Sequence, residues 1–289
     1  MFKKLVFLVY VNKYDSQSEM VSFSTKIPLE IHFHHLFVKF FRLNLLKGGV
    51  FMLTSEFPGK YGFHLEYPIG VVRFSRGIDE VIQSASIIKL PIFLYGFHYM
   101  KDLDKNIVVS PTDLVDGAGI LQTLVTDPRE FSVRDLHALM MVVSDNTATN
   151  LLIRHYGMKR LNKYLQHLGM TKSGLGRIMR DSLAIEEGRD NLVCARDVVA
   201  CLRTMASSPA FHDMLHILEK QQFQNKVPAG VKNEQFVFFN KTGEVDNVEH
   251  DVGFFVYKGQ VGLFVGLTEG PNVQGRSLLH EFGKMILNL

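Results

Sequence analysis

Short runs of alternating or β-branched hydrophobic residues occur near both ends of the chain. Two of them, residues 61–67 and 70–74, are joined by a Pro-Ile pair and predict a β-hairpin. Three further runs, separated by glycines and polar residues, predict strands near 235–241, 251–258 and 260–267. The pattern therefore indicates a five-stranded antiparallel sheet built from the two ends of the chain.

Between these strands, hydrophobic residues recur every three or four positions, which is the period of an α-helix. The pattern predicts helices near 87–101, 132–143, 147–156, 159–168, 196–206 and 210–222, and a last helix near 276–288. Ser132 and Asp135 form a capping-type pair where one helix begins, and Gly157 and Gly169 stand where two helices end. A fold of the α/β (α+β) class, with an all-helical region inserted between the second and third strands, accounts for this order most simply.

We therefore expect the body of the chain to form two domains. Residues 52–85 and 223–289 would form the sheet domain, and residues 86–222 the inserted all-helical domain. Ligand sites occur preferentially where domains meet, so we expect a catalytic cleft between the two.

The first 51 residues differ from the rest in composition. They contain no alanine, two glycines and eight of the 23 phenylalanines, a bias that AT-rich codons produce without selection for packing. A charged and then apolar stretch at 1–11 is similar to an export signal, but no small-residue cleavage site follows it. Residues 47–49 can be encoded by a purine-rich ribosome-binding sequence just ahead of Met52. We hypothesise that translation starts at Met52 and that residues 1–51 are an extension of doubtful origin.

Two alternatives give this segment a role. Residues 35–46 could form a helix that packs on the sheet, and the cluster of His32, His34 and His35 could bind a metal, although incidental residues explain it as well. No other feature of the sequence indicates a metal or a cofactor.

Composition and charge narrow the function classes. The chain is 46% hydrophobic and 21% charged, as in ordinary globular proteins. Its net charge is +3, and residues 1–51 contribute seven Lys/Arg against three Asp/Glu, so the remainder is close to neutral. This balance argues against a nucleic-acid partner. No run approaches the roughly 18 apolar residues of a membrane span. We expect a monomer that acts on a small molecule.

The two cysteines bear on the compartment. Cys194 and Cys201 lie seven residues apart on one predicted helix, so their Cα atoms are roughly 10 Å apart along its axis and they should not form a disulfide. Two free thiols fit a reduced compartment. A cytoplasmic location is favoured if translation starts at Met52, and secretion if the N-terminal segment is a genuine signal.

Ser86 and Lys89 are candidates for a nucleophile and its base. They begin a helix that is apolar on all sides, and Pro91 requires Ile87 to lie in the first turn, which places Ser86 at the cap. Free N–H groups at such an end can stabilise an oxyanion. Burial and the positive end of the helix dipole lower the pKa of Lys89, which makes it a plausible base. A single Ser-x-x-Lys also occurs by chance in a chain of this length.

Two further motifs follow in order. Ser144-Asp145-Asn146 lies between two predicted helices, where it could face a cleft or simply cap a helix. Lys241-Thr242-Gly243 ends a predicted apolar strand, where a cation and a hydroxyl can bind a carboxylate, although the sequence is also a common strand-to-turn transition. The three motifs together resemble the class A β-lactamase and penicillin-binding family, from about Gly59 to Leu289.

The resemblance implies a role for each matching residue. Ser86 would attack the substrate carbonyl, Lys89 would accept its proton and Ser144 would relay a proton to the leaving nitrogen. Asn146 would hydrogen-bond the substrate amide. The family fold is the five-stranded sheet with an inserted helical domain predicted above.

The resemblance also assigns roles to residues in the part of the site that lies on the sheet. Lys241 and Thr242 would bind the substrate carboxylate, and Gly243 would let a ligand approach the backbone. The backbone N–H groups of Ser86 and Glu244 would form the oxyanion hole, with the Glu244 side chain in solvent. Residues 117–121 are similar to the family's turn before a helix that lines the cleft, but also to a plain loop.

The chain departs from the family in one motif. Class A β-lactamases carry a Glu-x-x-Leu-Asn loop whose glutamate activates the water that clears the acyl-enzyme, and no such motif stands between Gly169 and Asp197. Asp181, Glu186 or Glu187 could take this role, but each is better explained as a carboxylate in a structural salt bridge or on an exposed loop. Acylation is therefore better supported than deacylation.

Three functions remain open on this evidence. The first is a serine hydrolase of β-lactamase type that opens a β-lactam or a related amide or ester without a cofactor. The second is a D,D-peptidase or slow penicillin-binding protein that acylates but deacylates poorly. The third is a non-catalytic binding module, which gives no reason to keep the three motifs together.

Overall fold

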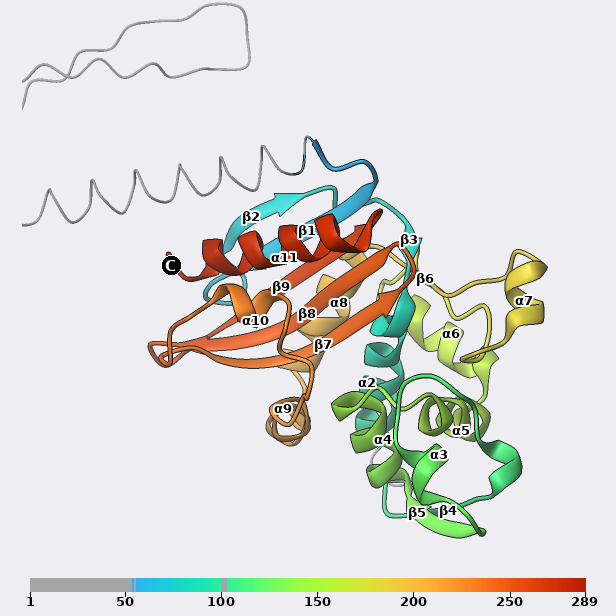
Figure 1. Cartoon of the computed structure of the whole chain (residues 1–289). Helices are drawn as coiled ribbons and strands as arrows, with labels where there is room; N and C mark the ends of the chain where they lie inside the picture. The colour runs from blue at the N-terminus through green and yellow to red at the C-terminus, as the bar shows by residue number, and fades with distance from the viewer. Residues whose placement is uncertain (1–53, 55, 100–102) are drawn as a thin grey trace, which may run out of the picture. The chain divides into compact units, whose positions relative to one another are not determined.

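The computed structural model describes residue 54 and residues 56–99 and 103–289. The doubtful extension 1–51, with its histidine cluster and the possible helix at 35–46, lies outside these residues. A five-stranded sheet in the order β2-β1-β9-β8-β7 forms one half of the described structure, and every neighbouring pair is antiparallel (Figure 1). The strands are β1 (Lys60–Glu66), β2 (Val72–Arg76), β7 (Val237–Val245), β8 (Val248–Tyr257) and β9 (Gln260–Glu269).

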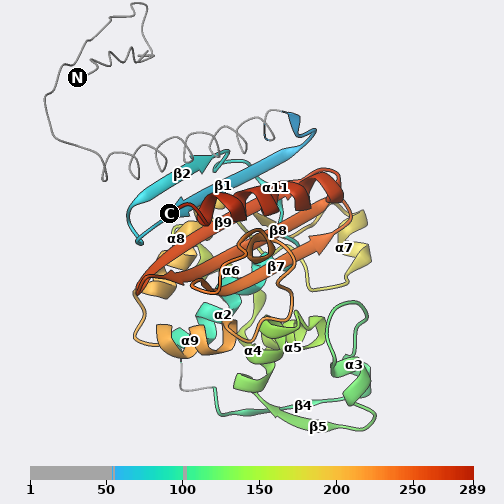
Figure 2. The same cartoon turned by 60° about the vertical axis from the view of Figure 1, so that its left-hand side comes forward.

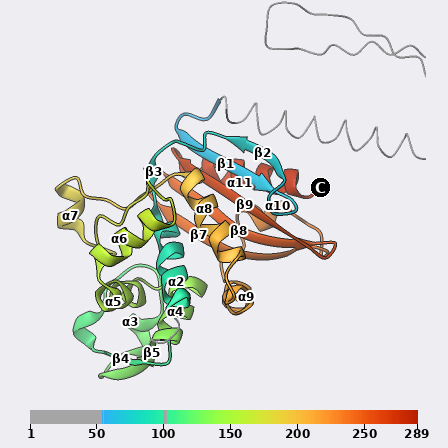
Figure 3. The same ribbon diagram turned by 180° about the vertical axis from the view of Figure 1, so that it is seen from behind.

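Helices cover both faces of this sheet. The C-terminal helix α11 (Asn272–Ile286) crosses one face, and α8 (Ala195–Ala206) crosses the other (Figures 1 and 3). Strand β8 is therefore buried along almost its whole length. Fully buried Phe63, Phe264 and Phe282 pack between the sheet and α11, and burial of each stabilises the fold by about 2–3 kcal/mol.

The other half consists mainly of helices around α2 (Lys89–His98). Residues 89–97 of α2 are all buried, and the helix packs against α4, α5, α6 and α8 (Figure 2). A 3₁₀ turn, η1 (Ala85–Ile88), leads into α2. The remaining helical elements are η3 (Pro111–Asp113), α3 (Leu121–Leu124), α4 (Val133–Val142), α5 (Asn146–Tyr156), α6 (Met158–His167), α7 (Ser182–Glu186), α9 (Phe211–Leu218) and α10 (Val227–Gly230).

The predicted fold class is confirmed, with differences in detail. Residues 86–222 are not all helical, because β4 (Asn106–Val109) pairs with β5 (Arg129–Ser132) and β6 (Leu192–Val193) pairs with β3 (Ile82–Gln83). Runs of two to four residues are too short for a periodicity to identify. Ser132 caps α4 and bonds reciprocally with Asp135, as predicted.

Two properties of the sequence can be compared with the described residues. Cys194 and Cys201 are both buried and free, in agreement with their predicted spacing. Across residues 56–99 and 103–289, the helices fall short of the length and hydropathy that crossing a bilayer requires.

Candidate active site

Ser86 lies inside the 3₁₀ turn η1 and not at a helix cap, which corrects the sequence-based placement. Ser84 is the N-cap of this turn, and Ala85 takes a left-handed φ of 43° just before Ser86. The apolar run after Ser86 made the α-helix look one turn longer than it is. A 3₁₀ turn has three residues per turn, so side chains at i and i+3 eclipse each other. Ser86 and Lys89 are therefore aligned on one side of the segment.

Ser144 connects Ser86 to Lys89. Its Oγ donates to Ser86 Oγ at 2.9 Å and accepts from Lys89 Nζ at 3.0 Å. Lys89 Nζ also donates to the Ser144 carbonyl at 2.7 Å and to Asn146 Oδ1 at 3.0 Å. Ser144 has a φ of 58°, a conformation that non-glycine residues take only when the surroundings impose it.

Asp145 fixes the chain directly after Ser144. Its Oδ1 accepts from Ala148 N at 2.8 Å and so caps α5. Its Oδ2 accepts from Ile120 N at 2.7 Å and Leu121 N at 2.9 Å, which ties the loop before α3 to the same point. The helix cap expected from this motif is confirmed at Asp145, while Ser144 and Asn146 contact Lys89.

Strand β7 contributes Lys241 from its middle and not from its end. Lys241 Nζ donates to Ser144 Oγ at 3.1 Å and to the Thr242 carbonyl at 2.7 Å. A Cβ at Gly243 would lie 3.2 Å from both Ala85 and Ile87 atoms, so glycine allows η1 to approach the strand. Thr242 is buried in the same stretch.

The two lysines of this group carry their charge poorly. Both side chains are fully buried. Burial lowers the pKa of Lys89 to about 7, although Asp145 acts in the opposite direction. Burial, Lys89 and Lys226 together hold the pKa of Lys241 well below its usual range. An amine that is half neutral near pH 7 can accept a proton from a serine hydroxyl.

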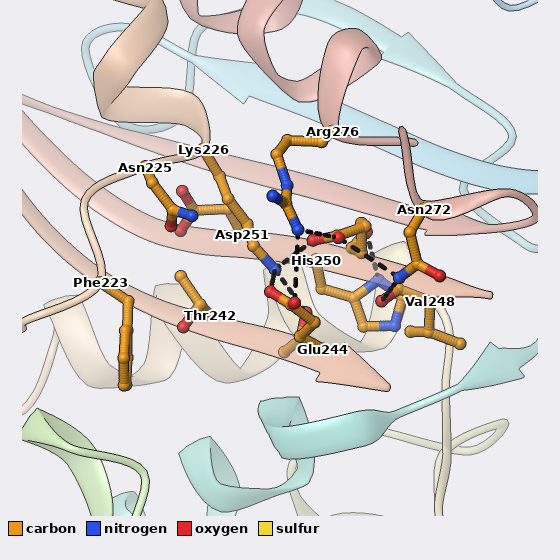
Figure 4. Close-up of polar contacts among 12 residues, drawn as sticks. Phe223, Asn225, Lys226, Thr242, Glu244, Val248, His250, Asp251, Asn272 and Arg276 are labelled. Atoms are coloured by element: carbon orange, nitrogen blue, oxygen red, sulfur yellow. Dashed lines mark hydrogen bonds and ion pairs between the residues drawn. The ribbon is translucent and has the colours of Figure 1, made fainter. Parts of the chain in front are cut away.

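Sequence reasoning missed Lys226, a buried cation behind this strand. Its Nζ donates to the Gly243 carbonyl at 2.9 Å and lies 2.5 Å from Glu249 Oε2. Figure 4 shows its side chain directed toward those of Glu244 and Arg276. Arg276 Nη2 pairs with Glu249 Oε1 at 2.6 Å. The Glu244 side chain is exposed, as expected, and its carboxylate lies 3.2 Å from Lys226 and 3.3 Å from Arg276. A lysine in an irregular segment gives no sequence signal for such a cluster.

His250 and Asp251 of β8 are further buried groups that the sequence did not reveal. His250 Nε2 donates to the Gln83 carbonyl at 2.8 Å, which anchors the segment just before η1, and burial lowers the pKa of this histidine to about 4. Asp251 accepts from Val227 N at 2.9 Å and so holds the start of α10. Burial raises the pKa of Asp251 to about 7.

Comparison with known proteins identifies the family. A sequence model described as the β-lactamase enzyme family matches residues 50–289. This chain belongs to the β-lactamase enzyme family. A search of curated proteins found no match.

Solved structures agree with this assignment. A β-lactamase from Sphaerobacter thermophilus is 27% identical, with a TM-score of 0.74, over 84% of this chain and 95% of that one. PBP-A is 24% identical with the same TM-score, over 84% and 94%. A class A β-lactamase from Bacteroides cellulosilyticus shares the fold at 17% identity and a TM-score of 0.73, over 84% and 96%. The chain is a serine β-lactamase-like hydrolase.

The three candidate deacylation carboxylates make other contacts in this family member. Asp181 caps α7 by accepting from Ala184 N at 3.0 Å. Glu187 pairs with Arg189, and Glu186 is exposed. Among the described contacts, none of these carboxylates interacts with Ser86, Lys89 or Ser144.

Met179 occupies the part of this loop that lies on α5. Asn150, one helical turn after Asn146, accepts from Met179 N at 2.7 Å and donates to Met179 O at 3.1 Å. The ends of the loop are joined by an Arg177–Asp190 ion pair at 2.8 Å. Within the described part of the chain, no group of three or more His, Cys, Asp or Glu residues could hold a metal ion.

Proposed function

We propose that this chain is a serine hydrolase of the class A β-lactamase type that is acylated on Ser86 by a β-lactam or a related amide or ester. The observation that carries the proposal is the hydrogen-bond chain from Ser86 Oγ through Ser144 Oγ to Lys89 Nζ. Its last member has a pKa of about 7, lowered by burial, so it can receive a proton at neutral pH.

The proposed acylation step is balanced within these residues. Ser86 Oγ attacks the carbonyl carbon and forms a C–O bond while its proton passes to Ser144 Oγ and the Ser144 proton passes to neutral Lys89 Nζ. For this transfer the two hydrogen bonds, in which Lys89 donates to Ser144 and Ser144 to Ser86, reverse their direction. The C–N bond then breaks, and the proton returns through Ser144 to the leaving nitrogen. The backbone N–H groups of Ser86 and Glu244 would stabilise the oxyanion.

The remaining residues would bind and orient the substrate. Asn146 would hydrogen-bond the substrate amide. Its side chain is already held in place by its contacts with Lys89 and with the loop before α3. Lys241 and Thr242 would bind the substrate carboxylate, and Gly243 keeps this part of β7 close to η1. An arriving carboxylate would meet Lys241 Nζ, which contacts no carboxylate among the described residues, and the anion would favour the protonated form of this amine.

We propose slow release of the acyl group. A buried methionine lies where the loop meets α5, and the nearby carboxylates are exposed or cap a helix. This arrangement supports the second candidate, a slow penicillin-binding protein or D,D-peptidase, over efficient turnover. The proposed site lies where the predicted sheet domain (52–85 and 223–289) meets the predicted helical domain (86–222).

One experiment separates these functions. The protein is incubated with a chromogenic cephalosporin and with benzylpenicillin, and colour and intact mass are followed. We expect a covalent adduct on Ser86. It should persist for a time in which an efficient enzyme would complete many turnovers. The adduct should be absent from Ser86→Ala and present in Ser277→Ala, which removes an exposed serine of α11.

Each outcome has a clear meaning. Fast colour change without an accumulating adduct indicates an efficient β-lactamase, and a lasting adduct indicates the slow protein. Absence of both in the wild-type protein would leave the binding module as the remaining function.

A further inference from the structure

A salt bridge joins two loops beside Asn146. Arg180 Nε donates to Asp116 Oδ1 at 2.6 Å, and Arg180 Nη2 donates to Asp116 Oδ2 at 2.8 Å, so the contact is bidentate. The two side chains are 55% and 70% exposed, which means that the bridge can open without disrupting the core.

Both loops are also fixed to helix α5. The Asp116 carbonyl accepts from Asn146 Nδ2 at 3.1 Å, and Asn146 N donates to the Ala118 carbonyl at 2.9 Å. Met179, next to Arg180, is held through both its backbone groups by Asn150. The helix, the two loops and the salt bridge therefore form a closed ring of contacts.

The ring lies against the amide end of the proposed site. A Cβ at Gly117 would lie 2.9 Å from Asn146 Nδ2 and 3.5 Å from Arg180 Cδ, so the arginine stem and the asparagine amide flank the same glycine. Arg180 has a left-handed φ of 65°, which only the surrounding contacts can hold in a non-glycine residue. A group carried by the substrate amide that bonds Asn146 must pass beside this bridge.

We propose that the Asp116–Arg180 bridge determines specificity by limiting the size of the acyl group that the site accepts. The inference rests on the proposed acylation of Ser86. A small acyl group fits with the bridge closed, whereas a bulky one requires the two loops to separate. A bulky substrate therefore loses the stabilisation that the ion pair provides.

The test compares two penicillins that share a nucleus and differ in the acyl group. Benzylpenicillin carries a phenylacetyl group, and methicillin carries a bulkier dimethoxybenzoyl group at the same amide. The measured quantity is the second-order rate of Ser86 adduct formation for each, followed by intact mass. In Arg180→Ala we expect the methicillin rate to rise about fivefold relative to benzylpenicillin, which is the value of a good exposed ion pair. The benzylpenicillin rate should change by less than about twofold.

Three controls define the cause. Arg189→Ala removes an equally exposed arginine of the same loop that pairs with Glu187, and it should leave the ratio of rates unchanged. The charge-reversed pair Asp116→Arg with Arg180→Asp should restore the wild-type ratio. In about 1 M NaCl, where screening acts over about 3 Å, the ratio should rise in the wild-type protein and not in Arg180→Ala.

The possible failures are distinguishable. If both penicillins form the adduct and the ratio is the same in wild type, in Arg180→Ala and at high salt, the bridge does not determine specificity. If the wild-type protein neither forms an adduct with the two penicillins nor hydrolyses them, the proposed function itself is wrong and this inference falls with it.

Discussion

Two groups of buried lysines, Lys226 alone and Lys89 with Lys241, differ in what faces their charges. Lys226 donates to the Gly243 carbonyl and pairs with the fully buried Glu249. Lys89 and Lys241 contact only hydroxyl, amide and carbonyl oxygens. Burial is similar in all three, so the missing counter-ion, and not burial alone, distinguishes Lys89 and Lys241 from Lys226.

The carboxylate of Glu249 shows the effect of its two cationic partners. Burial raises the pKa of Glu249, but Lys226 and Arg276 outweigh it, so this pKa lies below its usual range. The arrangement of Lys226, Glu249, Arg276 and Glu244 balances two positive against two negative charges. We infer that this cluster fixes the shape of β7 while the uncompensated amines perform the chemistry.

The largest effect expected from this comparison is the loss of activity in Lys89→Met. Removal of a general base lowers rates by about 10²–10⁴-fold, so we expect adduct formation on Ser86 to slow about 10³-fold. The free energy of unfolding should change by no more than about 1 kcal/mol, because a similar apolar side chain replaces a poorly charged buried amine. Intact-mass kinetics and urea denaturation measure the two quantities. A large loss of stability with normal acylation would reverse the assignment of the two lysine groups.

The opposite pattern is expected for Lys226→Met. Removing Lys226 takes one of two cations from the fully buried Glu249 and leaves it with Arg276 alone, so the free energy of unfolding should fall by about 3 kcal/mol. The double variant Lys226→Met with Glu249→Gln should recover part of this loss, because the incompletely compensated carboxylate is then absent. Urea denaturation measures both. Equal stability of Lys226→Met and the wild-type protein would mean that the cluster is not structural.

The sequence predicted most of the fold because its elements are long and regular. The strand β9 and the helices α4 and α5 lie within a few residues of their predicted bounds, since each has a clear hydrophobic period. The pairs β3–β6 and β4–β5 were missed because they are too short to show one. The helix predicted at 210–222 ends at Leu218.

The site was predictable only where a motif marked it. The three motifs are brought together by hydrogen bonds among Ser86, Lys89, Ser144 and Lys241. Lys226 and His250 carry no motif, and their importance depends on contacts between segments that are distant in the sequence. The 3₁₀ winding of η1 was also not predictable from the sequence. It depends on the close approach of this segment to Gly243 and on the hydrogen bond from His250 to the Gln83 carbonyl.

The pH dependence of acylation tests the lowered pKa of Lys89 in the wild-type protein. The base must be neutral, so the rate should follow the unprotonated fraction of a group with a pKa of about 7. Between pH 5 and 7 this fraction rises roughly 50-fold, and above about pH 8 the rate should be level. Adduct formation under pseudo-first-order conditions measures the profile. A rate that keeps rising tenfold per unit to pH 10 would show that the amine is as basic as one in water.

The smallest effect concerns the strain next to the nucleophile. Ala85 takes a left-handed φ of 43°, a conformation that costs an alanine about 1–2 kcal/mol and a glycine almost nothing. Part of this gain is lost because glycine is more flexible in the unfolded chain, so Ala85→Gly should raise the free energy of unfolding by about 0.5–1 kcal/mol. Acylation should slow a few-fold, since the Ala85 side chain faces Gly243 and its loss would loosen the segment that holds Ser86 against Ser144. Arg180→Gly, at a φ of 65° outside the reacting group, serves as the comparison in urea denaturation. If Ala85→Gly lost stability, the contact with Gly243 would outweigh the strain, and η1 would be held by packing alone.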